Sequence, residues 1–280
     1  MKLIRRMSKS LLVLFIVMAS FTFCPFTLFA DGNASANNEA DFEIKLTDDA
    51  NGSIITKYKG ARKDVIVPAT IQGLPVVEVG GIKGVETAVI PEGVKRISAE
   101  AFGSNWSGSS YPLKSVHLPE GLEVIGDYAF YQCNNLTSVN FPSTLKAIGV
   151  RAFGKTKLGE VTLSEGLEVM GRDVFVECKE LTAISLPKSL YWVMGSIAKD
   201  CNKLEQIDIP DGISLRVRDF DKMTFEFLFS GTKIRESITL QRLLKTHNTM
   251  PFVDDTSDEQ YHARKQQWKD IGDKYGISVY

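Results

Sequence analysis

The sequence is poor in the residue types from which catalytic and metal sites are built. Its three histidines, His117, His247 and His262, share no ligand spacing, and no cysteine or carboxylate completes a zinc pattern with any of them. No nucleophile motif surrounds the four cysteines, and no glycine-rich stretch carries the lysine and hydroxyl of a phosphate loop. The sequence therefore predicts no catalytic residue, no cofactor and no metal, and an enzyme is the weakest functional class.

Long apolar runs are absent except at the N-terminus. Basic residues at positions 2, 5, 6 and 9 precede the apolar run 11–19, and a small residue, Ala30, follows at a plausible cleavage point. This order predicts a signal peptide over 1–30 and an exported mature chain. The run is shorter than the ~20 residues of a spanning helix. Phenylalanines up to residue 29 prolong its apolar character, so an uncleaved anchor is the alternative.

The charge balance argues against nucleic-acid binding. Removing the four basic residues of 1–30 leaves 29 basic against 34 acidic residues, a net charge of about −5. Such a chain has no electrostatic reason to bind nucleic acid or an anionic membrane. No second long hydrophobic run follows. Residues 31–40 are polar and small, which predicts a flexible leader.

A repeat of about 23 residues dominates the rest of the chain. Units with alternating apolar residues, most of them closed by proline, end at residues 68, 91, 119, 142, 164, 187 and 210, so the steps are 23, 28, 23, 22, 23 and 23. A fixed period of this length indicates a solenoid. The full pattern is L-x-x-I-x-L-P-x-x-L-x-x-I-G-x-x-A-F-x-x-C-x-x, seen in 113–135, 136–157 and 158–180, and with Ala198 in the phenylalanine slot in 181–203.

This pattern resembles the BspA-like family of leucine-rich repeats, found in bacterial surface and secreted proteins and in some microbial eukaryotes. The resemblance covers roughly residues 42–233. It implies a non-enzymatic protein that adheres to proteins of a host or of neighbouring cells.

Alternation within the repeat explains how one unit folds. In the segment 115–118, Val116 and Leu118 point inward while Ser115 and His117 point outward. Phe130 fills the interior of the same unit, which cannot bury its apolar side without neighbours. We therefore predict a leucine-rich-repeat solenoid over 85–240, with short parallel strands stacked in a right-handed superhelix.

Both ends of the solenoid need covers. Residues 41–84 are predicted to form the N-terminal cap with a first degenerate repeat, beginning with a hairpin of 42–46 and 54–58 around an Asn51-Gly52 turn. Calcium binding by the acidic stretch 48–52 is the alternative, but the ligand set is incomplete. Residues 241–280 are predicted to form a capping tail whose helix aligns Tyr261, Trp268, Ile271 and Tyr275 on one face.

Three cysteines share one column of the repeat. Cys133, Cys178 and Cys201 each stand three positions after the phenylalanine slot. We expect buried thiols that behave as small apolar groups. Export permits a disulfide, and Cys178 with Cys201 on neighbouring coils is the pair within reach.

Partner contact is expected in three places. The outward strand column is small, polar and nearly uncharged. The first full repeat is five residues longer and carries aromatics in a Gly/Ser-rich loop, and an aromatic pair in the repeat 181–203 is either a contact patch or covered by the tail. The candidate partner-binding residues are Trp106, Tyr111, Ser115, His117, Ser138, Asn140, Tyr191 and Trp192.

The leading hypothesis is a secreted or cell-surface protein that binds an extracellular or surface protein. One alternative is a structural scaffold of the envelope or periplasm. Another is a carbohydrate-binding module that uses Trp106, Tyr111, Tyr191 and Trp192.

Overall fold

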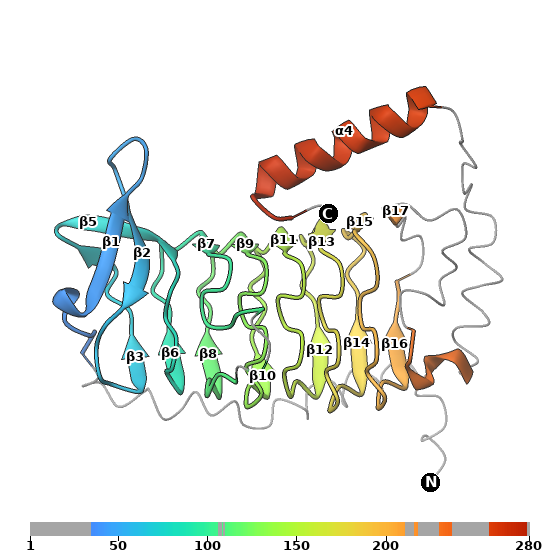
Figure 1. Ribbon diagram of the computed structural model, residues 1–280, viewed down its shortest axis with the longest axis horizontal. Helices are drawn as coiled ribbons and strands as arrows, with labels where there is room; N and C mark the ends of the chain where they lie inside the picture. Colours follow the sequence, from blue (N-terminus) through green and yellow to red (C-terminus); the bar gives the residue numbers. More distant parts are fainter. Residues whose placement is uncertain are drawn as a thin grey trace, which may run out of the picture. The chain divides into compact units, whose positions relative to one another are not determined.

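Each repeat forms one coil of a solenoid and carries two short parallel strands (Figure 1). The computed structural model describes residues 35–105, 108, 110–210, 216–217, 230–236 and 258–278. The first strand row consists of β3 (Asp64–Ile66), β6 (Thr87–Val89), β8 (Ser115–His117), β10 (Ser138–Val139), β12 (Glu160–Thr162), β14 (Ala183–Ser185) and β16 (Gln206–Asp208). These strands coincide with the repeat units found in the sequence, so the predicted solenoid of parallel strands is confirmed.

A second strand row, which the sequence did not reveal, runs along another side of the coils. It consists of β5 (Leu74–Val79), β7 (Arg96–Ile97), β9 (Val124–Ile125), β11 (Ala147–Ile148), β13 (Val169–Met170), β15 (Trp192–Val193) and β17 (Arg216–Val217). Most of these strands are two residues long, too short to show an alternating pattern. The row is continuous from β5 to β17, whereas the first row is not.

The first strand row is divided between β10 and β12, which belong to separate sheets. The repeat that leads into β12, residues 136–157, has 22 residues, one fewer than its neighbours. The shorter repeat thus coincides with the place where the backbone pairing of the first row stops. A side chain bridges the gap, because Ser164 Oγ donates to the carbonyl oxygen of Phe141 at 2.7 Å.

Stacked phenylalanines form the centre of the core. Phe102, Phe130, Phe153 and Phe175 are fully buried, with successive ring centroids 5.1, 5.0 and 5.8 Å apart and near-parallel planes. Each ring fills the interior of its own coil, and Phe130 and Phe153 contact the rings of both neighbouring coils. The phenylalanine column predicted from the repeat is therefore the core of the solenoid.

The cysteine column lies beside the phenylalanines. Cys133, Cys178 and Cys201 are free and buried, as expected. Cys178 Sγ donates to the carbonyl oxygen of Phe153 at 3.2 Å, and Cys201 Sγ donates to that of Phe175 at 2.9 Å. Burial raises the pKa of the Cys133 thiol. The disulfide between Cys178 and Cys201 that export would permit is not formed.

Two columns of left-handed residues join neighbouring coils. Tyr128 and Arg151 precede the Ala-Phe pair with φ of 55° and 51°, and Lys155 follows it with φ of 62°. Their amide groups donate to carbonyl oxygens of the next coil at 2.8 to 2.9 Å. A non-glycine residue in this region costs roughly 1 kcal/mol. The inter-coil hydrogen bonds offset that cost, so the strain is repeated at every turn.

The N-terminal hairpin is confirmed, but its turn differs from the prediction. β1 (Phe42–Leu46) pairs antiparallel with β2 (Ser53–Tyr58), and β2 continues the second strand row by pairing with β5; β4 (Thr70–Ile71) also pairs with β5. The left-handed residue of the turn is Ala50, not Asn51 or Gly52. Asp49 accepts hydrogen bonds from Thr47 Oγ1 at 2.6 Å and from the amide of Asn51 at 3.1 Å, and these bonds lower its pKa.

The end of the predicted leader 31–40 is packed against the first coil, which corrects the expectation of a flexible segment. The Asn37 amide donates to the carbonyl oxygen of Ile66, and Asn37 Oδ1 accepts from the amide of Ile66, each at 2.9 Å. Asn37 Nδ2 also donates to the hydroxyl of Tyr58 at 3.2 Å. Asn37 thus pairs with the edge of β3, and the short helix η2 (Glu39–Asp41) follows it.

The C-terminal helix α4 (Asp258–Tyr275) lies over the outer face of the second strand row (Figure 1). Trp268 and Tyr275 are buried against this face and Ile271 packs beside them, as the predicted helix face requires. Helix α4 therefore covers a side of the solenoid. The capping tail was predicted over 241–280; its described part, 258–278, covers this side and not the open end, and its residues 241–257 lie outside the described residues. The short helix η3 (Lys233–Glu236) lies between the last coil and the tail.

Truncating one stacked phenylalanine tests the core. We expect Phe153→Ala to lower the free energy of unfolding by ~3–5 kcal/mol, because it leaves a cavity in contact with three coils. Denaturant unfolding followed by circular dichroism measures the change. The matched control is Ser138→Ala on the exposed face of β10, for which a change within ~0.5 kcal/mol is expected. A loss below ~1 kcal/mol for Phe153→Ala would contradict the assignment of the core.

Candidate functional site

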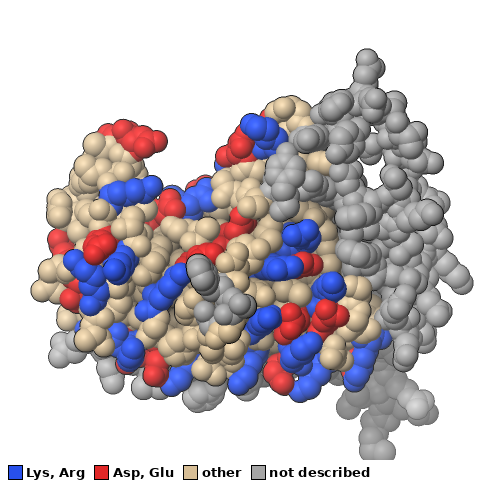
Figure 2. All heavy atoms as spheres, viewed as in Figure 1, with Lys and Arg blue, Asp and Glu red and all other residues tan. Residues whose placement is uncertain are grey.

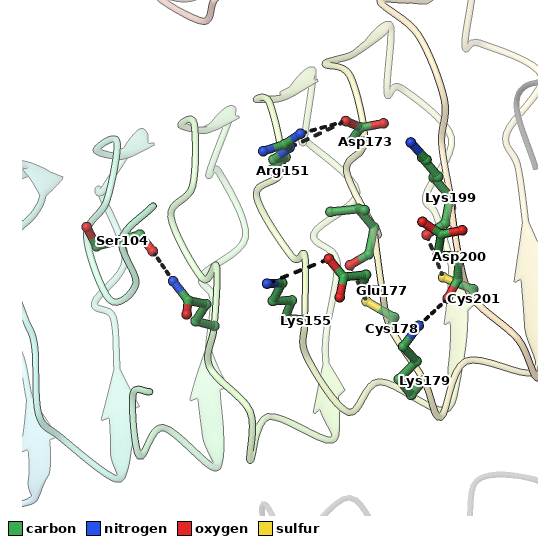
Figure 3. Close-up of polar contacts among 12 residues, drawn as sticks. Ser104, Arg151, Lys155, Asp173, Glu177, Cys178, Lys179, Lys199, Asp200 and Cys201 are labelled. Atoms are coloured by element: carbon green, nitrogen blue, oxygen red, sulfur yellow. Dashed lines mark hydrogen bonds and ion pairs between the residues drawn. The ribbon is translucent and has the colours of Figure 1, made fainter. Parts of the chain in front are cut away.

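The extra loop of the first full repeat is held at its base by the next coil. Gln132 Nε2 donates to the carbonyl oxygen of Ser104 at 2.8 Å, and the backbone oxygen of Gln132 accepts from the amide of Tyr111 at 3.0 Å. Figure 3 shows the contact at Ser104. The Asn134 amide group lies 3.2 Å from Ser110 Oγ. The loop 104–111 therefore leaves and rejoins the solenoid at a defined clamp.

Gln132 combines the features that this clamp needs. Its side chain is 5% exposed and its backbone is left-handed, with φ of 64°. Ser104, which the Gln132 side chain holds, also donates a hydrogen bond from its Oγ to the Glu100 carboxylate at 2.8 Å. Sequence reasoning missed Gln132, because its column of the repeat holds various polar residues and only the preceding coil carries the inserted loop.

The aromatic residues of the loop have separate positions. Tyr111 is half-buried and packs against the core, and Lys83 Nζ lies 5.9 Å from the centroid of its ring. Tyr111 therefore anchors the loop. Trp106 lies outside the described residues.

The strand face beside the loop contains the other candidates. Ser115 and His117 on β8 are half-buried, while Ser138 on β10 and the following Asn140 are exposed. The Asn140 side chain donates to the carbonyl oxygen of Leu118 at 2.8 Å and accepts from its amide at 3.2 Å. Asn140 therefore joins the coils, although its exposed edge stays at the surface.

The aromatic pair at 191–192 lies under α4, away from the loop. Trp192 is 6% exposed and belongs to one apolar cluster with Trp268 and Tyr275. The Tyr275 hydroxyl donates to Glu168, and burial raises the pKa of that hydroxyl. The structure thus supports the prediction that the tail covers this pair, and it does not bring Trp192 together with the other candidates.

Several charged side chains of the described coils pair with an opposite charge on a neighbouring coil. Arg151 Nη2 lies 3.2 Å from Asp173, and Lys155 Nζ lies 3.6 Å from Glu177 (Figure 3). Figure 2 shows positive and negative side chains interspersed over the viewed face. An exposed pair such as Lys155 with Glu177 stabilises little, whereas Asp173 is buried beneath Arg151. The alternation of charges leaves no continuous basic stripe of the sort that nucleic acid requires on this face.

Within the described ranges the structure contains no cluster of three or more metal-ligating side chains. Nor does any helix in that part of the chain combine the length and apolar character needed to cross a membrane. The arrangement offers an exposed strand face and an anchored loop, which are suited to contact with another molecule.

Stacked coils with two strand rows and a leucine- and isoleucine-rich lining define a leucine-rich-repeat solenoid. Residues 103–227 match the family model of the BspA type leucine rich repeat region in six copies. This repeat region therefore belongs to the BspA-type class of leucine-rich repeats. The class is generally non-enzymatic.

Solved structures of bacterial leucine-rich repeat proteins have the same fold. A leucine rich repeat protein of T. pallidum is 27% identical over 76% of this chain and 95% of its own, with a TM-score of 0.63. A leucine-rich repeat protein from Bacteroides ovatus is 26% identical over 71% of this chain, with a TM-score of 0.55; the match spans 50% of that protein's length. A comparison with curated proteins found no match.

Removing the clamp should loosen the loop and leave the solenoid intact. Gln132→Gly introduces a residue that tolerates the left-handed backbone, and it deletes the side-chain amide that holds Ser104. Losing a hydrogen bond worth ~1 kcal/mol should speed chymotrypsin cleavage within 104–111 by roughly fivefold, with little change in melting temperature. Ser138→Ala is the control. Unchanged cleavage would show that other contacts hold the loop.

Proposed function

We propose that this protein is an exported, non-enzymatic binding protein of the cell surface or the secreted fraction. Its partner is an extracellular or surface protein, which contacts the loop 104–111 and the adjoining strand face of β8 and β10. Three observations support the proposal: the repeat class, the signal-peptide pattern of residues 1–30, and the anchored loop. Residues 1–30 lie outside the described residues, so export rests on the sequence.

The anchored loop carries the proposal. The stacking of coils does not need its extra residues, since the neighbouring repeats close with 22 or 23. A clamp at Ser104 and Tyr111 lowers the entropy that the loop loses when it binds a partner. Trp106 within the loop is a residue type enriched at the energetic centres of protein interfaces. The small polar residues of the strand face supply complementarity around that centre.

The carbohydrate-binding alternative is less well supported. It requires four aromatics, Trp106, Tyr111, Tyr191 and Trp192, to act on one ligand. Trp192 is buried under α4, and Tyr111 is packed against the core. Tyr111 and Trp192 therefore belong to different surroundings, and a single sugar site that uses both does not fit this arrangement.

A scaffold of the envelope or periplasm is the remaining alternative, and exposure on cells separates it from the proposal. We expect external protease to digest the protein on intact cells, because a surface partner must reach the loop. A cytoplasmic protein and a periplasmic protein, probed on the same cells, serve as controls. Complete protection of the chain on intact cells, with digestion after lysis, would favour the scaffold.

Binding is tested with residues 31–280 as bait for extracellular proteins and with Trp106→Ala as the key variant. Under the proposal this substitution weakens binding of the captured partner by at least ~2 kcal/mol, roughly 30-fold in Kd. The melting temperature of the protein is expected to stay unchanged. Ser185→Ala on the distant strand β14 is the matched control. A melting temperature lowered by several degrees, with normal binding by the folded fraction, would make the loop a structural plug.

A further inference from the structure

An apolar stripe runs along the outer face of the second strand row. It consists of the outward residues of four consecutive strands in register: Val124, Ala147, Val169 and Trp192. The same register position is charged on either side of the stripe, with Glu78 and Arg96 before it and Arg216 after it. The sequence thus places apolar residues in this column on the coils that α4 covers.

Helix α4 contacts the stripe through a short run of apolar residues. Trp268, Ile271 and Tyr275 share one helix face, and Ile277 follows the helix into the same cluster. Polar contacts flank them: the Tyr275 hydroxyl donates to Glu168, and the amide of Ser278 donates to Asp127 at 2.9 Å. The helix and the stripe therefore have matched apolar and polar parts.

Neither helix α4 nor the apolar stripe is suited to be exposed to water without the other. Helix α4 has 18 residues, most of them polar, and a helix in a protein gains most of its stability by packing its apolar face against other elements. Val169 is 0% exposed under the helix, and an uncovered stripe would be an apolar patch of the kind that leads to association. The stripe consequently needs a helix with the apolar spacing of α4.

The chain between the solenoid and the helix is long enough to reach a neighbour. Twenty-one residues, 237–257, separate η3 from α4, and such a stretch reaches up to ~70 Å when extended. The stripe itself spans three strand spacings, about 15 Å. The contacts that α4 makes with its own stripe are chemically identical to those it would make with the stripe of a second copy.

From these observations we propose that α4 and the stripe form a self-recognition site through which two copies of this chain exchange helices. Each α4 would cover the stripe of the other copy, giving a two-fold symmetric, reciprocally exchanged dimer. The covalent connection keeps α4 close to its own stripe, so dilute chains stay closed. Crowded copies are the ones that exchange. This inference does not depend on the proposed partner of the loop 104–111.

A complementation experiment tests the exchange. It uses two variants of residues 31–280, and each variant carries a different tag. Trp268→Ala impairs the helix and leaves the stripe intact. Val169→Lys impairs the stripe and leaves the helix intact. Each variant by itself should be largely monomeric at about 100 µM, because neither variant carries both an intact helix and an intact stripe. Mixed together, they should form a heterodimer, because the intact helix of one copy has only the intact stripe of the other to cover.

Light scattering after size exclusion measures the mass, and capture through one tag confirms the heterodimer. Trp268→Ala mixed with Gln267→Ala, which alters an exposed position of α4, is the control pair and should yield at least tenfold less heterodimer. Neither substituted site lies in the phenylalanine core, and circular dichroism verifies that each variant is folded. Absence of a heterodimer up to about 500 µM, or equal amounts in the control pair, would overturn the proposal.

Discussion

No coil of this solenoid can bury its own apolar lining, and the whole structure depends on that constraint. Phe130 and Phe153 are covered only because the coils above and below supply the missing walls. Hydrogen bonds between coils follow the same rule. The left-handed amides of Tyr128 and Lys155 donate to carbonyl oxygens of the next coil and not of their own. Stability is therefore a sum of contacts between neighbours.

This constraint determines which polar residues are available for function. Asn140 stands on an exposed strand face, yet its amide replaces backbone pairing with Leu118. Arg151 and Lys155 lie at the surface, yet each forms an ion pair with a carboxylate of the following coil. The loop 104–111 is different, because it adds residues that stacking does not require. That is why a loop with a fixed base is the best supported contact site on this scaffold.

The two strand rows have different surroundings. The outer face of the first row is exposed or half-buried and mostly polar, whereas α4 covers the apolar part of the second. The exposed row is the one that we propose contacts a foreign partner, and the covered row packs against a segment of this chain. Separating the two faces allows partner binding and self-recognition to be altered by different substitutions, since Trp106 and Trp268 belong to different parts of the chain.

The sequence by itself determined the period, the inward positions, the phenylalanine and cysteine columns, the N-terminal hairpin and the apolar face of the C-terminal helix. Each of these is a matter of spacing and polarity along the chain, which a repeat displays many times. Only the tertiary structure decided the second strand row, the division between β10 and β12, the left-handed Ala50 of the hairpin turn, the docking of Asn37 on β3, the clamp at Gln132 and the burial of Trp192. These features arise from contacts between distant residues, such as Trp192 with Trp268, or from strands of two residues. Local pattern cannot specify them, because it shows that a side chain is apolar but not which distant element will cover it.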